Sequence, residues 1–204
     1  MSAAAPFCLR ALKEAEVYGI YLNNVGTAYA RAGWGEKALE ILQQAITLAG
    51  ENPEVHSNMG TVLKQQGRFE EAARAYQQAL SLHPRYALAY HQMGNLYRET
   101  GRLNDAAEAY ARALELQPNL LRAQVNLAFV HSETGRPDEA ILLARNALRF
   151  DPHDHDAHVV MAASLEAKGR SAQAIREYEA ALLIHPDNDE VRTRLRGLGA
   201  SDGK

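Results

Sequence analysis

The sequence has little that would support a disulfide-bonded, membrane-spanning or strongly charged protein. It contains one cysteine, Cys8, so no disulfide can form within the chain. The net charge is −3 at pH 7, which gives no broad electrostatic reason to bind nucleic acid. No segment approaches the roughly 20 consecutive apolar residues that a membrane span needs. We therefore expect no nucleic acid partner and no insertion into a membrane.

The N-terminus also lacks the features of a targeting signal. Residues 1–7 contain no basic segment and no long apolar run, both of which a secretory signal has. Cys8 is not preceded by the residues expected before a lipoprotein cysteine. A single cysteine is compatible with a reducing compartment, and we expect a cytoplasmic protein.

What the sequence does contain is a repeat of 34 residues. Glycine recurs at this spacing, at Gly33, Gly67, Gly101, Gly135 and Gly169. Alanine follows each glycine after five and after twelve residues, first at Ala38 and Ala45. Four repeats close with proline, at Pro84, Pro118, Pro152 and Pro186, and the first has Gly50 in that slot. A fixed period of about 20 to 50 residues is typical of a solenoid or an array of small units.

Each repeat predicts two helices. In the third repeat, the apolar residues from Tyr90 to Tyr97 recur at the spacing of one helical face. A second helical pattern starts at Asp105 and stops at Pro118, which lacks the backbone donor needed to continue a helix. Gly101 between them suits a helix C-terminus, because glycine adopts a left-handed backbone without a Cβ clash. The pattern predicts an all-α chain.

The residues that recur at fixed positions of each repeat resemble the pattern of the tetratricopeptide repeat. The matching residues of the third repeat are Tyr90, Gly94, Tyr97, Ala106, Tyr110, Ala113 and Pro118. The resemblance covers residues 19–188 and implies a right-handed α-solenoid of five helix-turn-helix units, at 19–52, 53–86, 87–120, 121–154 and 155–188. Departures occur at Ala128 and Ala162 (usually glycine), at His131 (usually a large residue) and at Ala144 (usually aromatic), and we expect weaker packing contacts there.

The two ends of the chain flank this array. Residues 1–18 predict a helical lead-in, because Cys8, Ala11 and Leu12 fit the second helix of an imaginary preceding repeat. The lead-in is either a cap on the first repeat or a remnant of a longer array. Residues 189–204 predict a capping helix, which keeps Val191 and Leu195 for packing and is otherwise charged, followed by a flexible tail.

The resemblance implies that the first helix of each repeat lines a concave groove. The sixth position of the repeat, which faces this groove in the family, carries carboxamides in four consecutive repeats. They are Asn24, Asn58, Gln92 and Asn126, and Val160 ends the series. The series resembles the asparagine ladder in the repeat domain of O-linked N-acetylglucosamine transferases, which grips the backbone of an extended polypeptide.

Elementary geometry supports peptide binding by such a ladder. A carboxamide offers both donors and an acceptor, and so complements a peptide group. Packed helices lie about 8–10 Å apart and an extended chain rises about 3.3 Å per residue, so one carboxamide could serve every third residue. His91 and Asn95, on the same helix as Gln92, are expected to add side-chain contacts. The alternative is a structural ladder that only joins neighbouring first helices.

The sequence therefore predicts a protein–protein interaction scaffold rather than an enzyme. It shows no nucleophile–base arrangement, no glycine-rich phosphate loop and no feature that calls for a cofactor. A clamp for a C-terminal carboxylate, another use of this fold, is disfavoured because Arg122 is the only basic residue at the second position of a repeat. The alternatives are a self-assembling scaffold, with the chain as a homo-oligomer, and the targeting domain of a larger transferase.

Three local features have a structural interpretation beside a functional one. The segment from Asp151 to His158 is rich in potential metal ligands, but it is an inter-repeat turn, so we favour caps and surface residues and expect no metal. An arginine follows the turn glycine in four repeats, at Arg68, Arg102, Arg136 and Arg170, and we call these the turn arginines. We expect them to cap helix-end carbonyls rather than to form a row of phosphate-binding residues. Trp34 either packs on the lead-in or contacts a partner.

Overall fold

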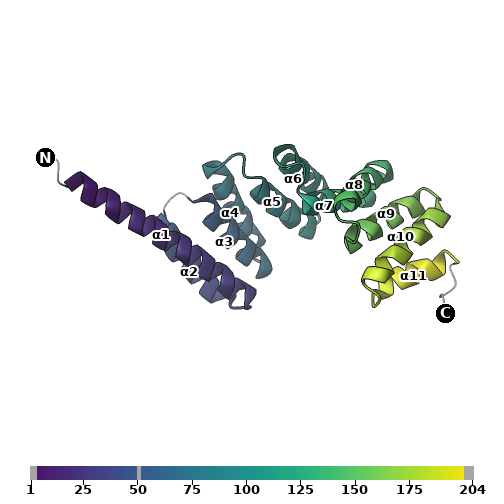
Figure 1. Cartoon of the computed structure of the whole chain (residues 1–204), viewed down its shortest axis with the longest axis horizontal. Coiled ribbons are helices and arrows are strands. Elements are labelled where there is room, and N and C mark those ends of the chain that lie inside the picture. Colours follow the sequence, from purple (N-terminus) through teal and green to yellow (C-terminus); the bar gives the residue numbers. More distant parts are fainter. Residues whose placement is uncertain (1–3, 50–51, 200–204) are drawn as a thin grey trace. The chain divides into compact units, whose positions relative to one another are not determined.

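The computed structural model describes residues 4–49 and 52–199, with side chains for residues 14–48 and 52–199. Throughout these residues the regular structure is α-helical (Figure 1), which confirms the all-α fold predicted from the sequence. The chain divides into two compact units, residues 1–100 and 101–204. Because the division falls inside the third repeat, we describe the two units separately.

Helices of the expected lengths follow one another in both units. The first unit contains α1 (Ala4–Arg31), α2 (Gly35–Ala49), α3 (Pro53–Gln65), α4 (Phe69–Leu82) and α5 (Ala87–Glu99). The second contains α6 (Leu103–Leu116), α7 (Leu121–Glu133), α8 (Pro137–Phe150), α9 (His155–Ala167), α10 (Ser171–Ile184) and α11 (Asp189–Gly197). The proline column lies two residues beyond the ends of α4, α6, α8 and α10, where it stops each helix.

The turn between the two helices of a repeat depends on glycine. Gly67 has φ +73°, and its N–H donates to the Lys64 carbonyl at 3.0 Å. The Arg68 N–H donates to the Leu63 carbonyl at 2.9 Å, which completes the paired C-terminal bonds of a Schellman motif. The glycine of every repeat has a positive φ, as the sequence pattern predicts.

Replacing Gly67 with alanine tests this turn. Gly67→Ala should lower the free energy of unfolding by about 1–2 kcal/mol, because a Cβ in the left-handed region approaches the following carbonyl oxygen. Urea unfolding followed by circular dichroism measures the change. Gly197→Ala is the matched control, since an added Cβ there meets nothing within 4 Å and the backbone φ is not positive. Equal losses in the two variants would contradict the role of φ at Gly67.

Close approach of the two helices of a repeat explains why the eighth position of every repeat is a small residue. These residues are Gly26, Gly60, Gly94, Ala128 and Ala162. A Cβ built at Gly60 on α3 would lie 2.7 Å from Cε1 of Tyr76 on α4, and Tyr76 is fully buried. In the fourth repeat, Ala128 and Ala144 are both fully buried and belong to one cluster. That repeat therefore packs two alanines where the second repeat packs glycine against tyrosine, so the two departures from the family pattern compensate each other.

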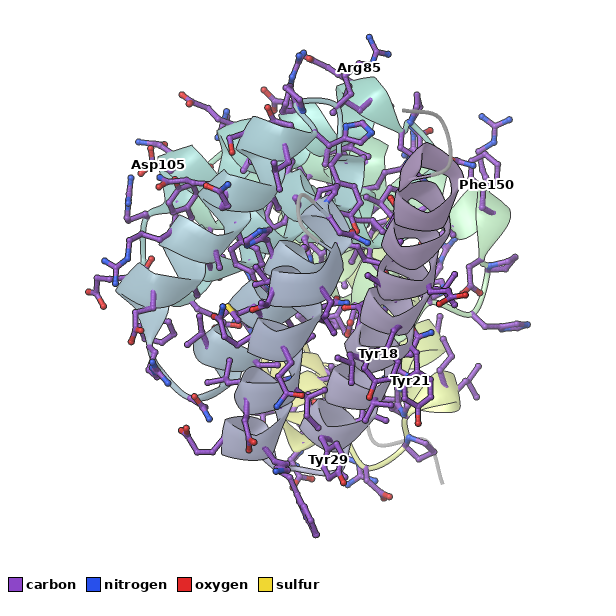
Figure 2. All side chains as sticks on the ribbon, turned by 90° about the vertical axis from the view of Figure 1, so that its left-hand side faces the viewer. Tyr18, Tyr21, Tyr29, Arg85, Asp105 and Phe150 are labelled. Carbon is purple, nitrogen blue, oxygen red and sulfur yellow. The ribbon has the colours of Figure 1, made fainter. Side chains whose placement is uncertain are left out.

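Helix α1 is twice the length of the other first helices and runs without a turn through the boundary expected between residues 18 and 19. The predicted lead-in and the first helix of the first repeat are therefore one helix. Tyr18 and Tyr21 are exposed on it (Figure 2). The side chains of Cys8, Ala11 and Leu12 lie outside the described residues, as do Gly50 and the predicted tail from residue 200.

At the other end, α11 packs as the sequence predicts. Val191 and Leu195 are buried, with exposed fractions of 1% and 8%. They join a cluster with Tyr178 and Leu165 of the fifth repeat. The other residues of the helix are mainly charged or polar, so α11 covers the apolar end of that repeat with a hydrophilic surface.

Two of the turn arginines, Arg68 and Arg102, bond to side-chain carboxylates. Nε of Arg68 donates to Oε1 of Glu71 at 2.7 Å, and Nε of Arg102 donates to Oδ2 of Asp105 at 2.7 Å. Each of these two arginines pairs with a carboxylate three residues later, because it directly precedes a second helix whose first turn is acidic. Exposed pairs of this kind contribute at most about 1 kcal/mol.

Candidate functional site

A groove of about 700 Å³ lies in the first unit. Helices α1 and α3 and the turn after α1 provide its lining residues, which are Asn24, Thr27, Ala28, Arg31, Ala32, Glu54 and Asn58. The structure thus brings two of the predicted carboxamides, Asn24 and Asn58, to the wall of one groove from neighbouring first helices. Asn24 is exposed and Asn58 is half-buried.

The groove wall is organised by Asn23, at the fifth position of the first repeat. Only 2% of Asn23 is exposed. Its Nδ2 donates to Oε1 of Glu54 at 3.2 Å, and its Oδ1 accepts a hydrogen bond from Nδ2 of Asn58 at 2.9 Å. A single buried carboxamide therefore holds two groove-lining side chains of α3 in defined positions.

These bonds bear on the alternative in which the ladder carboxamides only join neighbouring first helices. Asn58 does bond to the neighbouring first helix, but to the fifth position rather than to Asn24 at the sixth. Because a carboxamide has two N–H donors and an acceptor oxygen, the bond to Asn23 uses one of the three groups. Asn23 was not among the predicted ladder residues, and the burial of this polar side chain emerges only with the fold.

On α5, two of the other predicted residues contact each other. Nδ2 of Asn95 donates to Oε1 of Gln92 at 3.0 Å, and both side chains are half-buried, as is His91. This bond uses one of the two lone pairs of the Gln92 oxygen, and the Nε2 donors of Gln92 suit a peptide carbonyl. An ion pair between Lys64 and Glu99 joins α3 to α5.

Asn126, the fourth carboxamide, lies half-buried on α7 in the second unit. On α9, Val160 is fully buried, so the sixth position of the fifth repeat belongs to the core rather than to a ligand surface. Arg122 lies 3.8 Å from Oδ2 of Asp156, between α7 and α9. The one basic residue at the second position of a repeat therefore pairs within the protein.

The charge of the groove comes from Arg31 and Glu54. Burial lowers the pKa of His56, which lies on α3 outside the groove lining. Burial also raises the pKa of Tyr76 to about 12, and its hydroxyl donates to Oγ1 of Thr61 at 3.3 Å. The groove thus presents one cation, one anion and several neutral hydrogen-bonding groups, a composition suited to peptide groups rather than to a strongly charged ligand.

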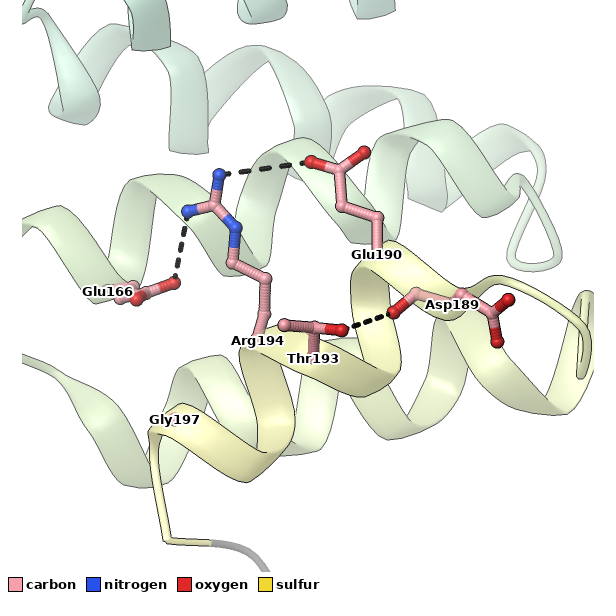
Figure 3. Close-up of a pocket in the computed structure, with 6 residues that line it drawn as sticks. All are labelled: Glu166, Asp189, Glu190, Thr193, Arg194 and Gly197. Carbon is pink, nitrogen blue, oxygen red and sulfur yellow. Dashed lines mark hydrogen bonds and ion pairs between the residues drawn. The ribbon is translucent and has the colours of Figure 1, made fainter.

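A second hollow, of about 570 Å³, lies beside α11 (Figure 3). Arg194 lies between two carboxylates, 3.7 Å from Glu166 and 3.9 Å from Glu190. The hydroxyl of Tyr178 donates to Glu166 at 2.9 Å, and burial, reinforced by the Glu166 carboxylate, raises the pKa of Tyr178. None of the predicted site residues lines this hollow, and the Arg194–Glu166 ion pair fastens α11 to the fifth repeat.

The histidine-rich turn behaves as a surface turn. Oδ1 of Asp154 accepts a hydrogen bond from the Ala157 N–H at 2.8 Å and caps α9. His158 contacts Glu177 at 2.8 Å, and His155 contacts Asp156 at 3.2 Å, so the two rings have separate partners. Among the residues with described positions, no three His, Cys, Asp or Glu side chains are grouped as a metal site requires.

Of the two interpretations of Trp34, contact with a partner stays a prediction. Its side chain is 63% exposed at the turn between α1 and α2. The indole contacts Tyr29, with the ring centroids 5.7 Å apart. The contact is therefore with the C-terminal part of α1 rather than with the lead-in.

Two family models match this chain. One model of the tetratricopeptide repeat matches residues 16–84, 53–119 and 86–152, and a second matches residues 131–197. The chain belongs to the tetratricopeptide repeat family. The finer resemblance of this tetratricopeptide repeat protein to O-linked N-acetylglucosamine transferases stays a prediction, and a search of curated proteins found no match.

Solved structures share the fold at low sequence identity. PilF of Pseudomonas aeruginosa has a TM-score of 0.75 at 20% identity, over 92% of this chain and 93% of PilF. MamA of Desulfovibrio magneticus RS-1 has a TM-score of 0.71 at 19% identity, over 84% of this chain and 97% of MamA. YrrB, described as a tetratricopeptide repeat protein with an unusual peptide-binding site, has a TM-score of 0.72 at 20% identity, over 92% of this chain and 97% of YrrB.

Across the described parts of the chain, no helix is both long enough and apolar enough to cross a membrane.

Proposed function

We propose that this tetratricopeptide repeat protein is a non-enzymatic scaffold that binds an extended segment of a partner protein in the groove of its first unit. The observation that carries the proposal is the buried Asn23, which holds Asn58 and Glu54 beside the exposed Asn24. A wall whose polar groups are already ordered loses less conformational entropy when a ligand binds.

The chemistry of the wall favours recognition of the peptide backbone. Asn24, Asn58 and Thr27 offer neutral donors and acceptors, which match the N–H and C=O groups of an extended chain. Gln92 on α5 would extend the same contact pattern within the first unit at the 34-residue period, and Asn126 of the second unit stays a predicted ladder residue. Backbone recognition of this kind tolerates many ligand sequences. The peptide-binding site named for YrrB is consistent with this use of the fold.

The test compares ladder and control variants on one peptide. A peptide selected from a random displayed library on the immobilised chain is labelled, and its affinity is measured by fluorescence anisotropy. Asn24→Ala combined with Gln92→Ala should weaken binding about tenfold to thirtyfold, because each lost hydrogen bond contributes about 1 kcal/mol. These two positions leave the Asn58–Asn23 bond intact, so the variant keeps its groove wall.

The matched control is Gln43→Ala combined with Gln77→Ala, which removes exposed carboxamides from the second helices α2 and α4. It should bind as the wild type does. Backbone recognition further predicts that N-methylation of central peptide amides weakens binding more than alanine replacement of the neighbouring side chains. An affinity that is unchanged in the Asn24/Gln92 variant would contradict the ladder.

A further inference from the structure

One asparagine connects the start of α11 to the start of α9. Asn188 precedes α11, and its Oδ1 accepts a hydrogen bond from the Val191 N–H at 3.1 Å, so Asn188 is the N-cap of the helix. Its Nδ2 lies 3.1 Å from Nε2 of His155, the first residue of α9. The same carboxamide therefore caps α11 and contacts a histidine ring of the fifth repeat.

The Val191 N–H determines which way the Asn188 carboxamide faces. The group that meets an N–H donor has to be the oxygen, so the NH2 group faces His155. Nε2 of His155 is therefore an acceptor, and the ring proton lies on Nδ1, which donates to Oδ1 of Asp156 at 3.2 Å. A neutral ring with this tautomer satisfies each hydrogen bond from Asp156 through Asn188 to Val191.

A second proton on His155 is incompatible with this set of hydrogen bonds. It would lie on Nε2 and oppose an N–H of Asn188 across 3.1 Å, so that two donors would face each other. Rotating the carboxamide by half a turn would give the ring an acceptor, but it would turn the NH2 group toward the Val191 N–H and remove the cap of α11. Only 13% of the His155 side chain is exposed, which leaves water little access to replace the lost bond.

The ionisable groups in contact with this ring do not remove the conflict. Asp156 lies on the same helix as His155, so its attraction for a charged ring does not depend on whether α11 is docked. Arg122 of α7, 3.8 Å from Asp156, reduces that attraction. The ring of His185, which follows α10, meets the His155 ring edge-on with centroids 4.7 Å apart and supplies no negative charge.

Three further carboxylates lie in the turns on either side. Asp187 lines a hollow of about 340 Å³ together with His155, but its side chain is fully exposed and lies 3.9 Å from Arg192. In the turn that leads into α9, Asp151 and Asp154 each accept a hydrogen bond from a backbone N–H. Among these groups, the Asn188 carboxamide is the one that both contacts the ring and caps α11.

Docking of α11 covers apolar side chains, because Val191 and Leu195 pack in one cluster with Leu165 and Tyr178. We propose that His155 is a pH-sensitive switch for this docking. The neutral ring accepts the Asn188 bond and α11 stays docked, whereas the charged ring loosens the first turn of α11. Since the docked helix favours the neutral ring, docking is strongest at the alkaline end of the histidine range of about pH 5 to 8 and weakens as the pH falls. The proposal is independent of the groove carboxamides and goes beyond peptide binding.

Hydrogen exchange of the full chain, read by mass spectrometry on peptides from α11, tests the switch. After correction for the intrinsic pH dependence of exchange, the protection factor of α11 should fall about threefold to thirtyfold between about pH 7.5 and about pH 5, the factor expected for loss of an N-cap. Peptides from α7 in the same samples report unfolding of the whole unit. A constant protection factor for α11, or an equal fall in α7, would overturn the proposal.

Two histidine variants assign the effect to one ring. His155→Gln keeps an oxygen that can accept from Asn188 but cannot titrate, so the fall in α11 protection should disappear. His185→Gln is the matched control, because it removes the other ring of the edge-on pair and should leave the fall in place. The proposal is wrong if His155→Gln retains the full fall. Circular dichroism at about pH 7.5 confirms that each variant is folded.

Asn188→Asp tests the direction of the effect. Aspartate keeps an acceptor for the Val191 N–H, and it replaces the opposing donor with a carboxylate oxygen that accepts from a charged ring. The pH dependence should therefore reverse, with α11 more protected at about pH 5 than at about pH 7.5. An Asn188→Asp variant whose protection falls with pH as in the wild type would show that the contact between Asn188 and His155 does not control docking.

Discussion

Tyr76→Ala is expected to lower the free energy of unfolding by about 3–5 kcal/mol, the range for removal of a large aromatic side chain from a core. Tyr76 is fully buried on α4, and its ring fills the space next to Gly60 on α3. Because glycine has no side chain that could move into the vacated volume, the cavity would stay largely empty.

Urea unfolding of wild type and variant measures this loss. Tyr76→Phe is the control, because it keeps the ring and removes only the 3.3 Å hydrogen bond to Thr61. A neutral bond of that length contributes about 1 kcal/mol or less. If alanine and phenylalanine destabilised the protein equally, the hydroxyl rather than ring packing would be the important contribution, and the prediction would be wrong.

Gly60→Leu is expected to destabilise the same contact from the other side, by about 2–3 kcal/mol, through overpacking. The first added atom alone would lie 2.7 Å from the Tyr76 ring, and leucine adds three more. Either the ring leaves its buried position or α3 moves away from α4. The same urea titration measures the effect.

The fifth repeat provides the control for this variant. It has Ala162 at the position of Gly60 and Tyr178 at the position of Tyr76, and both are buried in one cluster. One methyl group is therefore compatible with the contact, and Gly60→Ala should change the free energy of unfolding by about 1 kcal/mol or less. A loss for Gly60→Ala as large as that for Gly60→Leu would show that the backbone, rather than side-chain volume, limits this position.

Much of the fold was predictable because its determinants are local. The left-handed backbone at Gly67 and the stop at Pro84 follow from the chemistry of single residues. The 34-residue period repeats the glycine signal five times and the proline signal four times. The burial of Val191 and Leu195 was predictable for the same reason, since they continue the pattern of a first helix.

The candidate site was predictable only in part. The period placed Asn24 and Asn58 on equivalent surfaces, and the structure brings both to one groove. The bond from Asn58 to Asn23 was not predictable, because it depends on the distance between two helices and on which of two adjacent asparagines turns toward the core. Neither quantity is contained in the spacing of residues along the chain.

The sequence by itself determined the repeat, the helix pairs and the side of each first helix that carries polar groups, because these depend on local backbone chemistry and helical periodicity. Only the tertiary structure decided which equivalent positions are buried. Tyr21 and Val55 occupy the same position of the repeat, yet Val55 is fully buried and Tyr21 is 58% exposed. The physical reason is that burial depends on what packs against a surface, and the repeat that covers Val55 has no counterpart against Tyr21 among the described residues.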